Sequence, residues 1–116
     1  MKDKDDGYYA VIFTADVAAD LSGYADMAHR MRELVREQPG YIGMYHQMEG
    51  NREITISYWE NLNAVKTWKA HPEHQAAQEL GRSKWYADYQ VQLVRICSIT
   101  NEYEKPYSLF SIRHLP

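Results

Sequence analysis

EITISYWENLNAVKTWKAHPEHQAAQEL, residues 53–80, holds the pattern that decides the fold. Residues 53–60 alternate as a strand does, with Ile54, Ile56 and Tyr58 on one face and Thr55, Ser57 and Trp59 on the other. Asn61 follows at the position of a helix N-cap, and apolar residues recur at helical spacing as far as Trp68. The stretch therefore predicts a strand that leads directly into a short helix.

A break in this helix is predicted at His71 and Pro72. The residue before a proline is disfavoured in helical geometry, whereas proline itself suits the first turn of a new helix. We therefore expect a second helix over residues 72–83. On that helix His74 and Gln78 form a stripe beside the packing face, because residues four apart lie one above the other.

The residues before this stretch predict a strand, a helix and a second strand. Residues 8–17 alternate, with Tyr9, Val11, Phe13 and Ala15 on one face. Apolar residues at helical spacing between positions 21 and 35 predict a helix, which we expect Asp20 or Ser22 to cap and Pro39-Gly40 to end. A strand over residues 41–49 comes next.

A hairpin and a last strand complete the pattern. Gly50-Asn51 is a tight turn that joins the strand over 41–49 to the strand over 53–60. On the first of these strands we expect His46 to share a face with Ile42, Met44 and Met48, and Tyr41 and Tyr45 to lie on the other face. The final strand is expected over residues 89–100.

The element order is therefore strand, helix, strand, strand, helix, strand. Right-handed crossovers place both helical segments on one side of a four-stranded antiparallel sheet, which is the α+β ferredoxin-like βαββαβ plan. Residues 1–7 are predicted to be a flexible tail, residues 8–100 the folded domain, and residues 101–116 a C-terminal extension. The length of 116 residues fits one domain of this kind.

Both faces of the predicted sheet are apolar. The last strand has Val91 and Leu93 on one face and Val94 and Ile96 on the other. Helices cover only one face, and a second wet apolar face would exceed what soluble monomers usually expose. We therefore expect a homodimer that packs sheet to sheet as a dimeric α+β barrel. Alternatively, the 101–116 extension covers the open face of its own chain, or it clasps the partner.

Composition excludes several classes of partner. The net charge is −3 without a basic run, which disfavours nucleic acid, and no apolar run approaches the length of a membrane span. The single cysteine favours a reducing cytoplasm. Ten tyrosines, three tryptophans and two phenylalanines suit a small flat aromatic ligand, and they equally suit a small core or an oligomer interface.

The histidines near the helix break are the candidate chemical groups. Two histidines three apart are a possible metal pair, but Pro72 separates them and only Glu73 lies nearby, so no metal site is predicted. His71 either caps the helix or faces water. His74 lies in the first turn, where the helix dipole favours its neutral form, which can accept a proton or orient a hydroxyl group. Its structural alternative is an ordinary packed histidine.

A pocket between helix and sheet is expected beside these residues. Trp68, His74 and Gln78 would line it as catalytic candidates, and Gly81 would let another group approach the backbone closely. Further candidates for contact with a substrate are the aromatic and histidine residues Phe13, Tyr45, His46, Tyr58, Trp59 and Trp85. The three tryptophans equally suit core packing, and His46 is expected either at the barrel rim or hydrogen-bonded inside.

Three segments together resemble the antibiotic biosynthesis monooxygenase family. They are GYIGMYHQ (40–47), ITISYWENLNAVKTWKAHPEHQAAQELGRSKWY (54–86) and YQVQLVRI (89–96), and the likeness extends from residue 8 to about 99. The resemblance implies a ferredoxin-like fold, a dimer with a shared barrel, and one of two activities. One branch of the family oxidises aromatic polyketides with molecular oxygen and without metal or flavin, and the other binds and degrades heme.

The heme branch has a pattern that can be compared residue by residue. Its members use an asparagine on the first strand, a tryptophan in the helix after the third strand, and an iron-ligating histidine ten positions later. Trp68 matches the tryptophan, but Gln78 stands at the histidine position and the first strand has no asparagine, with Phe13 in that region. His74 could replace the iron ligand from the previous turn. We therefore expect no cofactor, with heme as the alternative.

The resemblance and the residues together predict a cytoplasmic homodimeric monooxygenase. It would use molecular oxygen on an aromatic or quinone-like substrate, with Trp68 shaping the pocket, His74 acting as base or orienting group, and Gln78 beside it. The alternatives are a heme-binding, heme-degrading monooxygenase and a non-catalytic dimer that only binds a small molecule.

Overall fold

The computed structural model describes residues 7–98 and contains the predicted order of elements. These are β1 (Tyr9–Val17), α1 (Tyr24–Arg36), β2 (Tyr41–Glu49), β3 (Arg52–Trp59), α2 (Leu62–Lys69), α3 (Pro72–Leu80), the π-helical turn η1 (Gly81–Trp85) and β4 (Tyr86–Arg95). The predicted N-terminal tail, apart from Gly7, and the 101–116 extension lie outside the described residues.

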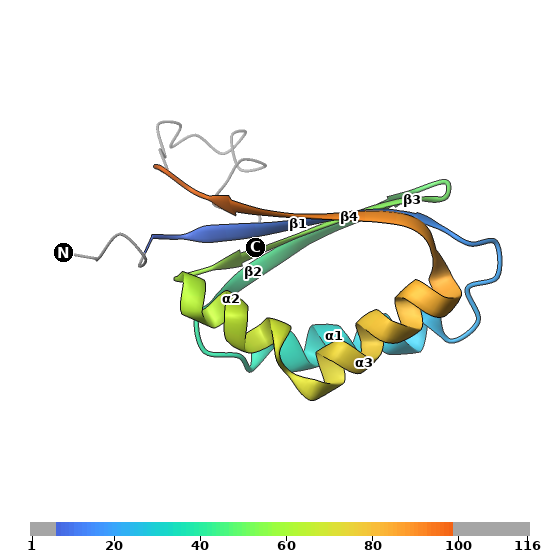
Figure 1. The fold of residues 1–116 in the computed structure, drawn as a ribbon, viewed down its shortest axis with the longest axis horizontal. Helices are drawn as coiled ribbons and strands as arrows, with labels where there is room; N and C mark the ends of the chain where they lie inside the picture. Colours follow the sequence, from blue (N-terminus) through green and yellow to red (C-terminus); the bar gives the residue numbers. More distant parts are fainter. Residues whose placement is uncertain (1–6, 99–116) are drawn as a thin grey trace, which may run out of the picture.

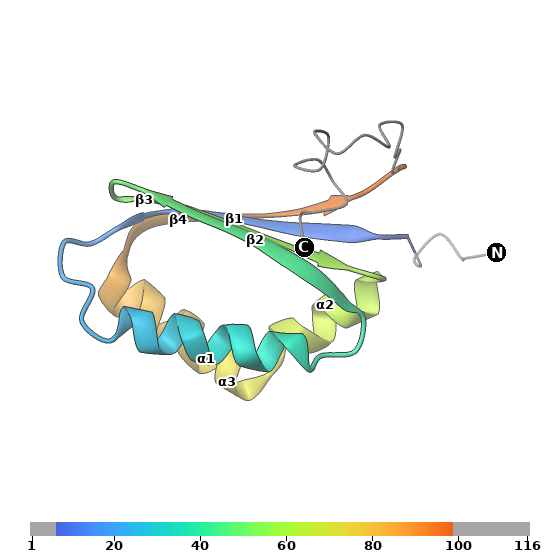
Figure 2. The same ribbon diagram turned by 180° about the vertical axis from the view of Figure 1, so that it is seen from behind.

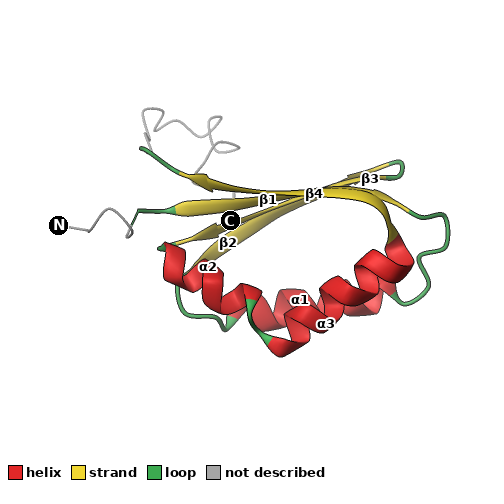
Figure 3. Ribbon diagram, viewed as in Figure 1, coloured by secondary structure: helices red, strands yellow, loops and turns green. Residues whose placement is uncertain are grey.

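The sheet and helices form two layers. The four strands lie in the order β2-β3-β1-β4, and all neighbouring pairs are antiparallel. Figures 1 and 2 show α1, α2 and α3 on the same face of the sheet, and Figure 3 shows the separation of helix from strand. The predicted α+β ferredoxin-like plan is confirmed. We call the face toward the helices the inner face and the opposite face the outer face.

Strand register defines which residues share the inner face. Directly paired residues of neighbouring strands point to the same side of a sheet. From the α2 end to the η1 end, four rows run across β1, β3 and β2: Tyr9–Trp59–Tyr41, Val11–Ser57–Met44, Phe13–Thr55–His46 and Ala15–Glu53–Met48. The predicted alternation of the first and third strands is therefore confirmed, and His46 lies on the helix side of the sheet.

The face assignment at the start of β2 is wrong for Tyr41. Tyr41 was expected on the face of the strand opposite to that of Met44, yet it pairs with Trp59 on the inner face. The register between β2 and β3 shifts between Tyr41 and Gly43. A bulge of this kind inserts an extra residue, so the alternation restarts after it. Period-two reasoning cannot show where such an insertion falls.

The helix ends agree with prediction at two places and differ at a third. Asn61 caps α2 through its side-chain oxygen, which accepts from the amide of Ala64 at 2.8 Å. His71 has an extended backbone and caps α3, its Nδ1 accepting from the Glu73 amide at 3.1 Å. The predicted cap of α1 is wrong, because Gly23 occupies that position with φ +83° and without a side-chain cap.

The junction between α3 and β4 is tighter than predicted. The α-helix ends at Leu80, the chain continues as the η1 turn, and β4 begins at Tyr86, ahead of the predicted start at residue 89. A Cβ added to Gly81 would lie 2.3 Å from Cε2 of Tyr86. Gly81 therefore permits a close approach, as expected, but the group that approaches is the ring of Tyr86 of the same chain.

The core lies between the inner face and the helices near α2. It consists of Leu34, Val35, Trp59, Ala64 and Trp68, with Trp59 fully buried. The outer face, by contrast, has Ile12, Ile54, Ile56, Tyr58 and Val94, and no helix of residues 7–98 packs against it. Within residues 7–98, none of the helices has the length and apolar character needed to cross a membrane.

Candidate functional site

Trp68 and His74 form a stacked pair at the junction of α2 and α3. Their ring centroids lie 4.3 Å apart at an interplanar angle of 14°, and the ring of His71 lies 5.4 Å from that of Trp68. The predicted break produces this geometry, because the extended backbone at His71 bends the chain between α2 and α3 and places the first turn of α3, with His74, against Trp68 near the end of α2. The structure thus brings together two of the three predicted catalytic residues.

His74 has a defined tautomer. Its Nδ1 lies 3.1 Å from the carbonyl oxygen of Trp68. A carbonyl can only accept, so Nδ1 carries the hydrogen and Nε2 is left as an acceptor. Burial lowers the pKa of His74 below 6.5, against the opposing effect of the hydrogen bond to Trp68. Nε2 is therefore an unprotonated nitrogen at neutral pH, which a base or an orienting acceptor needs.

The lowered pKa of His74 predicts an acid-sensitive stability. The unfolded chain takes up a proton on this histidine near pH 6.5, whereas the folded chain does so only at lower pH. The unfolded state therefore binds more protons in that window, and the free energy of unfolding decreases as pH falls below about 6.5. Urea unfolding measured between pH 7.5 and 5 should show this decrease, and His74→Gln should reduce its slope.

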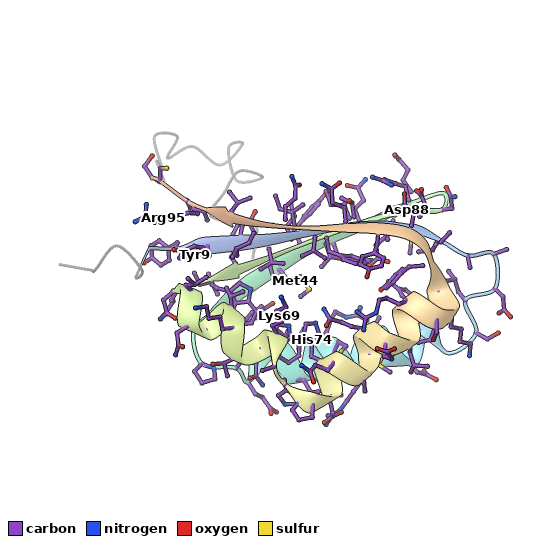
Figure 4. All side chains as sticks on the ribbon, viewed as in Figure 1. Tyr9, Met44, Lys69, His74, Asp88 and Arg95 are labelled. Atoms are coloured by element: carbon purple, nitrogen blue, oxygen red, sulfur yellow. The ribbon has the colours of Figure 1, made fainter. Side chains whose placement is uncertain are left out.

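The inner face is accessible in its middle and buried at its ends. Trp59 and Ala15 are fully buried in the two end rows, whereas Val11, Phe13, Met44 and Thr55 in the middle rows are only partly buried. On the neighbouring β4, Val91 and Leu93 pair with Phe13 and Val11 and are each 52% exposed. Figure 4 shows Met44 from β2, and Lys69 and His74 from the helical layer, in the region between sheet and helices. Solvent thus reaches the inner face from the β4 side.

A polar cluster that the sequence analysis missed lies at the η1 end of the inner face. The side chain of Glu53 is only 5% exposed. Its carboxylate accepts hydrogen bonds from the Tyr24 hydroxyl and from Oγ1 of Thr55 at 3.1 Å, and Nε2 of His46 lies 3.4 Å away. The sequence did contain one signal for this cluster. Glu53 lies six residues before the buried Trp59 in the same strand, so the two side chains point to the same face.

Two tyrosine hydroxyls meet beside this carboxylate. Burial raises the pKa of Tyr24, and its hydrogen bond to Glu53 adds to that shift. Burial and then the charge of Glu53 raise the pKa of Tyr86 to about 12. Both phenols therefore remain protonated at neutral pH, and Tyr24 donates its hydroxyl hydrogen to the carboxylate. The ring of Tyr86 lies 5.0 Å from that of Phe13, which connects this cluster to the accessible middle of the inner face.

The other predicted contact residues fall into three places. Phe13 and His46 share one row of the inner face, and Gln78 is half-buried on α3. Tyr45 follows Met44 and Tyr58 precedes Trp59, and adjacent residues of a strand point to opposite faces. Tyr45 and Tyr58 therefore lie on the outer face, and the structure does not bring them to His74. Trp59 and Trp85 are buried packing residues, and their Nε1 atoms donate to Ser57 Oγ and to the Ser22 carbonyl.

Two surface depressions are lined by residues other than the three catalytic candidates. A groove of about 440 Å³ runs between α1 and α3 and is lined by Met27, Met31, Ala76 and Leu80 among others. A smaller depression of about 290 Å³ lies at Thr14, Arg52 and Asp88 through Gln90. Neither is lined by Trp68, His74 or Gln78. Among residues 7–98 the histidine, cysteine and acidic side chains form no group of three that could hold a metal ion.

Comparisons of sequence find two matches. A family model described as antibiotic biosynthesis monooxygenase matches residues 10–80. The chain is also 43% identical over 90 residues to YqjZ, an uncharacterized protein of Bacillus subtilis, which covers 77% of this chain and 79% of that protein. The family model includes the α2–α3 junction with Trp68, because its match extends to residue 80.

Comparisons of structure find the same fold in proteins of low sequence identity. SnoaB of Streptomyces nogalater, described as a cofactor-independent oxygenase, superposes with a TM-score of 0.70 at 15% identity, over 83% of this chain and 99% of SnoaB. A putative antibiotic biosynthesis monooxygenase of Deinococcus radiodurans superposes with a TM-score of 0.72 at 14% identity, over 82% of this chain and 98% of that one.

Proposed function

The chain belongs to the antibiotic biosynthesis monooxygenase family, and from that premise we propose that it is a small monooxygenase acting with molecular oxygen on an aromatic or quinone-like substrate. The substrate would bind between the helices and the accessible middle of the inner face. The observation that carries the proposal is the state of His74, whose Nδ1–H is engaged with Trp68 and whose Nε2 is an unprotonated acceptor.

The oxidation of an electron-rich phenol by oxygen requires few groups of the protein. Removing the proton of an electron-rich phenol gives a phenolate, which passes an electron to oxygen far more readily than the phenol does. The protein then has to bind the ring, accept the proton and limit access of water. His74 would accept the proton or orient the hydroxyl, Trp68 would shape the wall, and Gln78 lies one turn further along α3. The description of SnoaB as cofactor-independent supports a route of this kind.

We also propose that the protein works as a homodimer in the cytoplasm. The outer face supports the dimer, because Ile12, Ile54 and Ile56 lie side by side there and the helices cover only the inner face. A second copy packed against it would remove this apolar surface from water. Cys97 is exposed and free, which fits a reducing compartment.

One observation favours heme binding as a second candidate function. Histidines that bind metals usually donate their other ring hydrogen to a carbonyl or carboxylate, and the contact between Nδ1 of His74 and the Trp68 carbonyl has this form. His74 Nε2 would then be the iron ligand, since Gln78 is a poor one. Hemin titration should in that case give a saturable shift of the Soret band, and His74→Ala should weaken it.

Oxygen consumption tests the primary proposal. We expect the purified protein to accelerate oxygen uptake in the presence of a dihydroxyanthracene or a naphthoquinol, with the rate saturating as substrate is added. Native mass spectrometry of protein purified from its own host should show the dimer mass and any retained ligand. If no substrate of a broad panel gives oxygen uptake and hemin does not bind, both proposed enzymatic functions are contradicted. A non-catalytic dimer that binds a small molecule would then remain.

A further inference from the structure

The Glu53 cluster has the arrangement of a buried carboxylate that holds a more accessible histidine. The side chain of Glu53 is 5% exposed and that of His46 is 36% exposed, with Nε2 of His46 3.4 Å from Oε2 of Glu53. In carboxylate–histidine pairs the buried acid fixes the tautomer of the imidazole and stabilises the imidazolium when a proton arrives. His46 shares its row with Phe13 and Thr55 in the accessible middle of the inner face.

We propose that Glu53 and His46 form a proton-accepting dyad on the sheet side, which takes up the proton of a phenolic hydroxyl bound at the inner face. The proposal rests on the proposed function only for the class of ligand. It adds a second proton acceptor to the one on α3, because His74 belongs to the helical layer and His46 to the sheet.

The proton balance of this step is simple. The O–H bond of the phenol breaks and an N–H bond forms at Nδ1 of His46, while Nε2 keeps its hydrogen at ion-pair distance from Oε2 of Glu53. The ligand becomes a phenolate, the imidazole becomes an imidazolium beside a carboxylate, and no electron moves. A quinol has two hydroxyl groups and loses two protons on oxidation, so a site with two separate acceptors suits a substrate with two hydroxyls.

The surroundings of Glu53 support a role beyond packing. A buried carboxylate is costly unless it is hydrogen-bonded or paired with a cation. Tyr24 and Thr55 supply hydrogen bonds to Glu53, and His46 is the one basic side chain within ion-pair distance of it among residues 7–98. Tyr24 and Tyr86, the other titratable groups of the cluster, are phenols that remain protonated at neutral pH. His46 therefore supplies the basic nitrogen that this cluster offers to a ligand at the inner face.

The probe for the test is 4-nitrophenol, whose phenol and phenolate forms absorb at different wavelengths. The measurement uses the full chain with His74→Gln, which removes the candidate proton acceptor of the helical layer and keeps His46 on the inner face. At a pH one unit below the pKa of the free probe, we expect the bound probe to contain a several-fold larger phenolate fraction than the free probe. Adding His46→Gln or Glu53→Gln should return this fraction to the solution value, whereas the matched control Glu60→Gln should leave it unchanged.

A second measurement determines the tautomer of His46 in the absence of any ligand. Nitrogen-15 spectra of the histidine rings in the otherwise unchanged protein should show His46 with its hydrogen on Nε2, and Glu53→Gln should shift those signals while Glu60→Gln should not. Unchanged ring signals in Glu53→Gln, no saturable binding of 4-nitrophenol, or an equal phenolate fraction in His46→Gln would each overturn the dyad. Phenolate formation without oxygen uptake would contradict the proposed function and uphold the dyad. Oxygen uptake at the wild-type rate in His46→Gln would contradict the dyad and uphold the proposed function.

Discussion

Replacing Trp59 by alanine is expected to lower the free energy of unfolding by about 3–5 kcal/mol. The side chain is fully buried, it packs edge-on against Tyr41 at 5.5 Å, and it lies 6.5 Å from the ring of Trp68. Truncation removes the transfer free energy of an indole and leaves a cavity between β3 and α2. It also removes the donor to Oγ of Ser57, a residue that is itself buried.

Urea unfolding followed by circular dichroism measures this change. A loss of that size is a large fraction of the roughly 5–15 kcal/mol that stabilises a typical domain, so the midpoint should move far down the urea scale. Leu93→Ala is the matched control, because Leu93 is an apolar residue of the same sheet with 52% of its surface exposed. A Trp59→Ala midpoint no lower than that of Leu93→Ala would contradict the core that we describe.

The fold could be predicted from the sequence because its signals are local. Alternation at residues 53–59, the cap at Asn61 and the proline at 72 each act within a few residues, and each is found where expected. The predictions were wrong at positions where the local sequence pattern carries no information. A bulge after Tyr41 restarted the alternation of β2, and a glycine in left-handed geometry replaced the expected side-chain cap of α1.

The candidate site could be predicted only in part. Trp68 and His74 are six residues apart, so the sequence could place them near one another across the helix break, but it did not predict that their rings stack. The Glu53 cluster unites α1, β2, β3 and η1–β4, so its members are far apart in sequence and only the register between strands brings them together. Tyr45 and Tyr58 were placed near a pocket by residue type, but strand parity puts them on the outer face.

The second large effect is expected on activity. His74→Gln should lower the rate of oxygen uptake about 100-fold or more, which is the usual contribution of a positioned acid or base. Glutamine is polar and of similar length, so it retains a donor for the Trp68 carbonyl, but it cannot take up a proton. Stability should change little at pH 8, where His74 is neutral in both the folded and the unfolded chain.

His29→Gln is the control for this substitution, because His29 is an exposed histidine whose side chain is 69% accessible on α1. It should retain the wild-type rate, which separates loss of the imidazole at one place from loss of any imidazole. A His74→Gln rate within fivefold of wild type would show that His74 only orients the substrate, since the glutamine amide can accept a hydrogen bond in its place. Proton removal would then depend on the sheet side of the site, and His46→Gln would have to show the large loss instead.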